Sequence, residues 1–131
     1  MKTLIVEDDF TSRLLMQELL KIYGPVHIAV NGKEALDAVR MALLANEPYD
    51  LICLDIMMPE MDGQQALSEI RALEEAQGIF SSEGSKIMMT TVMADLKNVS
   101  TAYMNLCDAY LTKPVHISVL DKELRTLKLI P

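Results

Sequence analysis

Five short apolar runs recur along the chain, and their spacing constrains the fold more than any other feature of the sequence. Each run has the length of a strand and little alternation of polar and apolar residues, which is typical of strands buried on both faces. Between the runs, apolar side chains recur every three or four residues, which predicts amphipathic helices. The five runs are residues Thr3–Glu7, Val26–Val30, Asp50–Asp55, Lys86–Thr91 and Ala109–Thr112.

The intervening helical patterns are also five in number, and each has one apolar face. Five strands that alternate with five helices predict an α/β fold, in which helices cover both faces of a parallel sheet. Right-handed crossovers leave few arrangements, and the flavodoxin-like strand order 2-1-3-4-5 fits five βα units. The predicted faces are Leu15, Leu19 and Ile22; Leu36, Val39 and Leu43; Ala66, Ile70 and Leu73; Leu96, Val99, Tyr103 and Leu106; and Leu120, Leu124 and Leu127.

Polar residues near the start of several helical patterns have the spacing of N-terminal caps. Asn31, Asp62 and Ser118 each stand three residues before an acid or an amide, as in a capping box. Asp9 is expected to cap the first helix, and Gly24-Pro25 is expected to end it.

The composition fits one soluble domain. The chain has 131 residues, half of them hydrophobic, so we expect a single domain over residues 1–131 with no attached effector domain. The net charge of -7 repels phosphate backbones and argues against direct binding of nucleic acid. No apolar run could span a membrane, and the start MKTLIVEDD lacks the features of a signal peptide. We therefore expect no membrane insertion and a cytoplasmic location.

Polar residues follow four of the predicted strands at their carboxyl ends. Glu7 and Asp8 end the first strand, and Asp55 ends the third. A threonine pair at residues 90–91 ends the fourth strand, and Lys113 follows the fifth. In the predicted order these ends are neighbours, so the acids, a hydroxyl and a lysine meet at one rim.

Carboxylates gathered at this rim repel one another unless a cation lies among them. One like-charge pair at about 4 Å costs roughly 4 kcal/mol at an effective dielectric near 20, against a typical domain stability of roughly 5–15 kcal/mol. Oxygen ligands favour a hard, hydrated ion, and Mg²⁺ fits. A carboxylate beside Mg²⁺ and a lysine can attack phosphorus, because both cations neutralise the phosphoryl oxygens.

Four motifs stand in order at these strand ends. They are LIVEDD, LDIMMPEMDG, IMMTTV and AYLTKP, and they extend from residue 4 to residue 114. With these motifs the chain resembles the receiver domain of bacterial two-component response regulators, especially the stand-alone, chemotaxis-regulator type. The resemblance implies a phosphorylation-activated switch, whose donor is a phosphohistidine of a histidine kinase or a phosphotransfer protein.

The resemblance also assigns roles at the metal site. Asp55 would be the phosphorylated aspartate, and Asp8 would be a direct ligand of Mg²⁺. Glu7 would act on the metal mainly through water. Met57 would offer the metal only its backbone carbonyl.

Three more roles follow from the resemblance. Thr91 looks like the switch hydroxyl, Tyr110 like a rotating aromatic, and Lys113 like the phosphate-binding lysine. Lys113–Pro114 is a candidate cis peptide. Thr90 competes with Thr91, and only one of them can face the site because successive strand residues point to opposite faces. The family's spacing to the lysine favours Thr91.

The resemblance places the output on the face of the fourth helix, fifth strand and fifth helix. An unidentified downstream protein would bind there, and a second copy of the chain, giving a homodimer, is another candidate. Phosphorylation would shift a pre-existing conformational equilibrium.

Several positions depart from the family pattern. Val92 stands where a small residue is usual, and Val92, Met57 and Met93 are expected to narrow access to the phosphoryl group. Phosphorylation by small-molecule phosphodonors and hydrolysis of the phosphorylated aspartate would then both be slower. Leu106 stands in the stretch where glycine is usual, and Val115 replaces an aromatic residue after Lys-Pro. Both lie near the expected output face, so the identity of the partner stays open.

Three other functions fit the sequence less well than the switch. A phosphorylation-independent interaction module would not need the intact set of Asp8, Asp55, Thr91 and Lys113. A magnesium-dependent phosphatase with an aspartate nucleophile usually has a second acid two residues later, where this chain has Met57. A dinucleotide-binding enzyme does not fit, because the first predicted strand is followed by acids and not by glycines.

Overall fold

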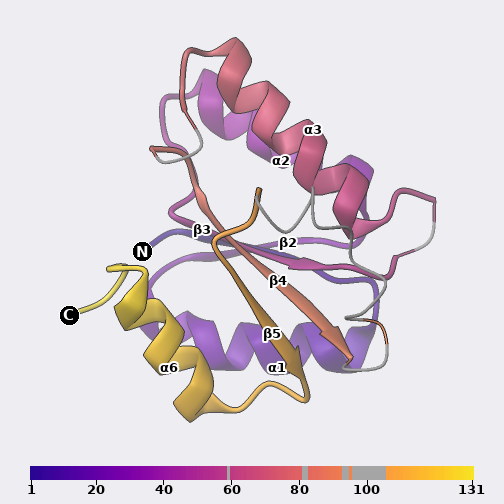
Figure 1. Cartoon of the computed structure of the whole chain (residues 1–131), viewed down its shortest axis with the longest axis vertical. Coiled ribbons are helices and arrows are strands. Elements are labelled where there is room, and N and C mark those ends of the chain that lie inside the picture. Colours follow the sequence, from indigo (N-terminus) through magenta and orange to yellow (C-terminus); the bar gives the residue numbers. More distant parts are fainter. Residues whose placement is uncertain (59, 81–82, 93–94, 96–105) are drawn as a thin grey trace.

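The computed structural model describes residues 1–58, 60–80, 83–92, 95 and 106–131. It contains a five-stranded parallel sheet in the order β2-β1-β3-β4-β5, as predicted (Figure 1). The predicted helix face of Leu96, Val99 and Tyr103 lies outside the described residues, as does Met93. The strands are β1 (Thr3–Val6), β2 (Val26–Ala29), β3 (Leu51–Asp55), β4 (Lys86–Val92) and β5 (Ala109–Lys113).

Helices cover both faces of the sheet, with α2 and α3 on one side and α1 and α6 on the other (Figure 1). The helices are α1 (Phe10–Leu20), α2 (Gly32–Leu44), α3 (Gly63–Ala76) and α6 (Ile117–Thr126), and a short 3₁₀ turn, η1 (Lys21–Tyr23), follows α1. No helix within the described residues is long and apolar enough to cross a membrane.

The core is divided by the sheet into two apolar layers. Alternate residues of the central strand β3 enter opposite layers, since Ile52 and Leu54 pack with α2 and α3 while Cys53 packs with α1 and α6. This alternation is the ordinary period of a strand. Because both faces are covered by helices, most residues of the central strands are apolar, and the polar ones lie at or near the strand ends.

Two-sided burial was predicted for all five runs, and this was wrong for the two edge strands. In β2, His27 and Ile28 are exposed, and in β5, Tyr110 is exposed. An edge strand has a neighbour on one side only and lies at the margin of the covering helices. The lack of alternation between polar and apolar residues therefore does not distinguish an edge strand from a central one.

The predicted apolar face of the first helix was wrong at Leu15 and Ile22, whereas Leu19 packs against the core. Met16 and Leu20 are buried against the sheet, whereas Leu15 is 41% exposed and Ile22 lies exposed in η1. Apolar residues are adjacent in this segment, so spacing alone did not select the buried face. For α6, burial of Leu120 and Leu124 confirms the prediction. Val39 of α2 and Ala66 and Ile70 of α3 are also buried as predicted.

Three of the four predicted helix caps are confirmed. The side chains of Asp9, Asn31 and Asp62 each accept a hydrogen bond from the backbone amide three residues later, at 2.8–2.9 Å. The prediction for Ser118 was wrong, because α6 begins at Ile117 and its cap residue is His116, without a side-chain hydrogen bond. Ser118 therefore lies inside the first turn.

A buried ionic network ties α3 to the starts of β4 and β5. The Arg71 guanidinium donates to Glu74 Oε1 at 2.7 Å, to Asp108 Oδ2 at 3.0 Å and to the carbonyls of Ser85 and Leu106 at 2.8 and 2.9 Å. Glu74 Oε2 also accepts from the Ser85 amide at 2.8 Å. The network lies at the end of the sheet opposite Asp55, and Leu106, where glycine was expected, contributes only its backbone.

Candidate functional site

Three acids come together where β1 and β3 end. Glu7 and Asp8 follow β1, and Asp55 is the last residue of β3. One carboxylate oxygen from each lies within 4.8 Å of the others. Glu7 is 2% exposed and Asp55 is 5% exposed, whereas Asp8 faces solvent. The predicted convergence of these acids is therefore present, with one open side.

Lys113 reaches the same cluster from the end of β5. Its ammonium hydrogen-bonds Glu7 Oε1 and lies 3.5 Å from Asp55 Oδ1. The Lys113–Pro114 peptide bond that follows is cis, as predicted. Lys113 therefore places one positive charge among the carboxylates.

The pKa values of the two inner acids are shifted in opposite directions. Burial, together with hydrogen bonding and repulsion from Glu7, raises the pKa of Asp55 to about 7. Burial also acts to raise the pKa of Glu7, but hydrogen bonds with Asp55 and Lys113 outweigh it and lower that pKa. The two carboxyls thus share a proton and the Lys113 charge when no other cation is present.

The donor set fits a small divalent cation. Carboxylate oxygens are the ligands of hard ions such as Mg²⁺, and an open side leaves room for the waters that Mg²⁺ keeps. A cation would also remove the repulsion that raises the pKa of Asp55. The chemistry of Glu7, Asp8 and Asp55 is therefore that of a magnesium site.

The turn after Asp55 depends on a glycine whose role the sequence did not indicate. The Met57 amide donates to Asp55 Oδ1 at 3.3 Å, and the Met57 side chain is 56% exposed. Gly63, the first residue of α3, packs against this strand end. A Cβ on Gly63 would lie 2.2 Å from the Asp55 carbonyl oxygen, so the start of α3 approaches β3 closely only with glycine there.

The two threonines of β4 lie on opposite sides of the sheet. Thr90 is in register with Asp55 and lines a cavity on the α1 side. Thr91 is buried and its hydroxyl donates to the Val92 carbonyl at 3.1 Å. Tyr110, on β5, is 44% exposed. The role of Thr91 and that of Tyr110 stay predictions.

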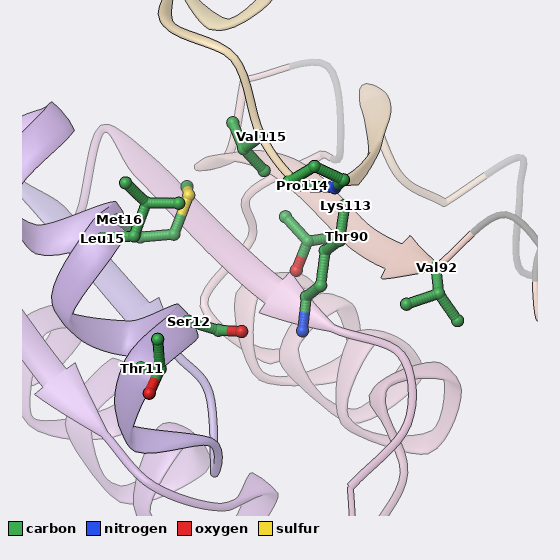
Figure 2. A pocket seen from close by; sticks show the side chains of 9 residues that line it. All are labelled: Thr11, Ser12, Leu15, Met16, Thr90, Val92, Lys113, Pro114 and Val115. Atoms are coloured by element: carbon green, nitrogen blue, oxygen red, sulfur yellow. The ribbon is translucent and has the colours of Figure 1, made fainter.

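A cavity of about 400 Å³ opens beside Lys113, between α1 and the loop that follows β5 (Figure 2). Val92 lies at the end of β4 in register with Lys113, and its side chain is exposed. Figure 2 shows the Lys113 side chain extending past Thr90. The cavity is lined by Thr11, Ser12, Leu15, Met16, Thr90, Val92, Lys113, Pro114 and Val115.

The sequence profile of the response regulator receiver domain matches residues 3–125, so the chain belongs to this family. It is 34% identical to "Hybrid signal transduction histidine kinase B" of Dictyostelium discoideum over 89% of the chain, which covers 6% of that kinase. Activities and partners of the whole kinase therefore do not transfer directly.

Two solved structures illustrate the structural similarity. The receiver domain of the histidine kinase CKI1 from Arabidopsis thaliana, complexed with Mg²⁺ and BeF₃⁻, superposes with a TM-score of 0.80 at 29% identity, over 98% of this chain and 90% of that one. The Vibrio cholerae chemotaxis protein CheY4 superposes with a TM-score of 0.72 at 24% identity, over 96% and 97%. The latter supports the fold alone.

Proposed function

We propose that this chain is a phosphorylation-activated signalling switch of a two-component phosphorelay, with Asp55 as the phospho-acceptor. A carboxylate oxygen of Asp55 forms the new bond to phosphorus as the bond from phosphorus to the donor imidazole nitrogen breaks. The imidazole leaves and takes up a proton. The donor is a phosphohistidine of a histidine kinase or a phosphotransfer protein.

One observation carries this proposal: a nearly buried aspartate at a strand end has both an acid pair and a lysine ammonium beside it. Asp55 lies 3.5 Å from Lys113 Nζ and clusters with Glu7 and Asp8. The acids alone would suit a structural metal, and the lysine alone would suit an ion pair. Together they suit a group that carries negative charge after it has reacted.

Mg²⁺, when bound, would neutralise phosphoryl oxygens. Asp8 and Asp55 would hold it directly, Glu7 through water, and Met57 through its backbone carbonyl. Lys113 would leave Glu7 and bind a phosphoryl oxygen. The chain is thus a phospho-acceptor that assists its own phosphorylation and dephosphorylation, not an enzyme for separate substrates.

The downstream protein would bind the face formed by β5, α6 and the segment predicted from the sequence as the fourth helix. Tyr110 is exposed on β5. Thr91 would bind the phosphoryl group and shift the population of the conformation that the downstream protein recognises. A cytoplasmic location and a chemotaxis-like signalling role belong to the same proposal.

A pair of variants tests which threonine is the switch. Thr91→Val should weaken beryllofluoride binding about tenfold or more, because a hydrogen bond to a charged group is lost. Thr90→Val has the matched change on the opposite side of β4 and should leave affinity within about twofold. Titration in the presence of Mg²⁺, followed by ¹⁹F NMR, measures both. The opposite ranking would assign the role to Thr90.

Val92 should limit access to the phosphorylated aspartate. Val92→Ala should raise the rate of dephosphorylation several-fold, because the side chain beside Lys113 becomes smaller. Val119→Ala, an exposed valine on α6, is the control and should change nothing. An unchanged rate in Val92→Ala would remove this idea.

A beryllofluoride titration separates the proposal from its rivals. With Mg²⁺, the switch should form a stable adduct that changes tyrosine fluorescence, since the chain has four tyrosines and no tryptophan. Steady turnover of a phosphate ester would indicate a phosphatase. Absence of both adduct and Mg²⁺ binding would indicate a phosphorylation-independent interaction module.

A further inference from the structure

One arginine of α1 holds the turn that carries two of the three clustered acids. Arg13 Nη1 donates to the Glu7 carbonyl at 3.0 Å and to the Asp8 carbonyl at 3.4 Å. The Arg13 backbone amide donates to the Asp9 carbonyl at 2.9 Å. Three consecutive carbonyl oxygens are therefore fixed by a single residue, which lies one turn into the helix.

The guanidinium of Arg13 is itself held in place. Its central carbon lies 5.6 Å from the centroid of the Phe10 ring, within the range of a cation–π contact. Phe10 is otherwise a largely exposed aromatic residue. We infer that this contact orients the guanidinium toward the turn, which is a structural role for the exposed Phe10 ring.

Asp8 differs from the other two acids in how its side chain is held. Glu7 and Asp55 both contact Lys113. Within the described part of the chain, no hydrogen bond or ion pair holds the Asp8 carboxylate, which is exposed. Its position therefore depends on the backbone of the turn, and the carbonyl of that same residue is one of those that Arg13 holds.

We propose that Arg13 is a positioning residue for the magnesium site, acting through the carbonyls of Glu7 and Asp8. The inference rests on the proposed function, which requires Mg²⁺ at these acids. Mg²⁺ demands near-ideal octahedral geometry, so a ligand carried on a loosely held turn binds it poorly. Arg13 reduces that freedom before the metal arrives.

Charge and position predict opposite effects of Arg13 on metal affinity. Arg13 is a cation near the cluster, and by charge alone it repels Mg²⁺. Its removal would then tighten Mg²⁺ binding. If Arg13 acts by position, its removal weakens binding. A lysine keeps the charge, but its ammonium lacks the planar face that lies over the Phe10 ring, so it should not replace arginine.

Calorimetric titration of Mg²⁺ into the purified, metal-free chain tests the proposal. Arg13→Met and Arg13→Lys should each weaken Mg²⁺ binding about tenfold, as loss of a residue that orients metal ligands does elsewhere. Lys21→Met is the matched control, since it removes an exposed cation just after α1 that pairs with Glu18, and should leave affinity unchanged.

Phe10→Ala keeps Arg13 but removes the ring beneath it, and should weaken binding less than either Arg13 variant. If an Arg13 variant does not fold, which circular dichroism of the metal-free protein would reveal, Phe10→Ala still tests the proposal. Tighter binding by Arg13→Met, or wild-type affinity in Arg13→Lys or Phe10→Ala, would overturn the proposal. A wild type that binds no Mg²⁺ would instead overturn the proposed function.

Discussion

Replacement of Arg71 by methionine should lower the free energy of unfolding by about 3–5 kcal/mol, the usual cost of removing one partner from a buried ion pair. Glu74, which is almost fully buried, would be left as a carboxylate without its cation. Asp108 and the carbonyls of Ser85 and Leu106 would also lose a donor. Urea denaturation of the metal-free protein measures the change.

Arg40→Met is the control for this experiment. Arg40 also pairs with an acid three residues away, Asp37, at 3.0 Å, but both side chains are largely exposed, so its removal should cost about 1 kcal/mol or less. Adding Glu74→Gln to Arg71→Met should recover part of the lost stability, because the unpaired charge is removed. Equal losses in Arg71→Met and Arg40→Met would contradict the account of the network.

Asp55→Asn should stabilise the metal-free protein at neutral to alkaline pH by about 1–3 kcal/mol. The cause is the crowding that raises the pKa of Asp55 from 3.8 to about 7. The folded state retains a proton that the unfolded chain releases, so the stability of the wild type falls as pH rises between these values. Asparagine carries no proton to lose, and the variant escapes this decline.

The pKa of Glu7 is lowered in the same cluster, and this offsets part of the destabilisation that the raised pKa of Asp55 causes. The gain in stability expected for Asp55→Asn is therefore smaller than the pKa of Asp55 alone would give. Unfolding curves from pH 4 to 8 without Mg²⁺ give the two profiles. Asp37→Asn, on the exposed side of α2, should follow the wild type. Parallel profiles for Asp55→Asn and wild type would show that Asp55 is not destabilised by its neighbours.

Most of the fold could be predicted from the sequence, because the apolar runs and their helical intervals are local patterns. The caps at Asp9, Asn31 and Asp62 are local too, since each needs only an amide three residues away. The buried face of α1 was not predictable, because several adjacent apolar residues offer more than one face. Its orientation is set by packing of Met16 and Leu20.

The site was predicted as far as strand topology determines it. The topology brings Glu7, Asp55 and Lys113 to one rim, and they are in contact there. The roles of Arg13 and Gly63 were missed, because each acts on backbone atoms and not on another side chain. Likewise, Arg71 and Asp108 are separated by 37 residues, and no local pattern indicated that the two would pair.

The most direct test of the central claim is the mass of the chain after incubation with Mg²⁺ and phosphoramidate, a small donor with the same phosphorus–nitrogen bond as phosphohistidine. The wild type should gain one phosphoryl group, located by peptide mapping at Asp55, and should not gain it when a chelator removes Mg²⁺. Asp55→Asn should gain none. An adduct that persists in Asp55→Asn, or no adduct in the wild type, would contradict the assignment of Asp55 as the phospho-acceptor.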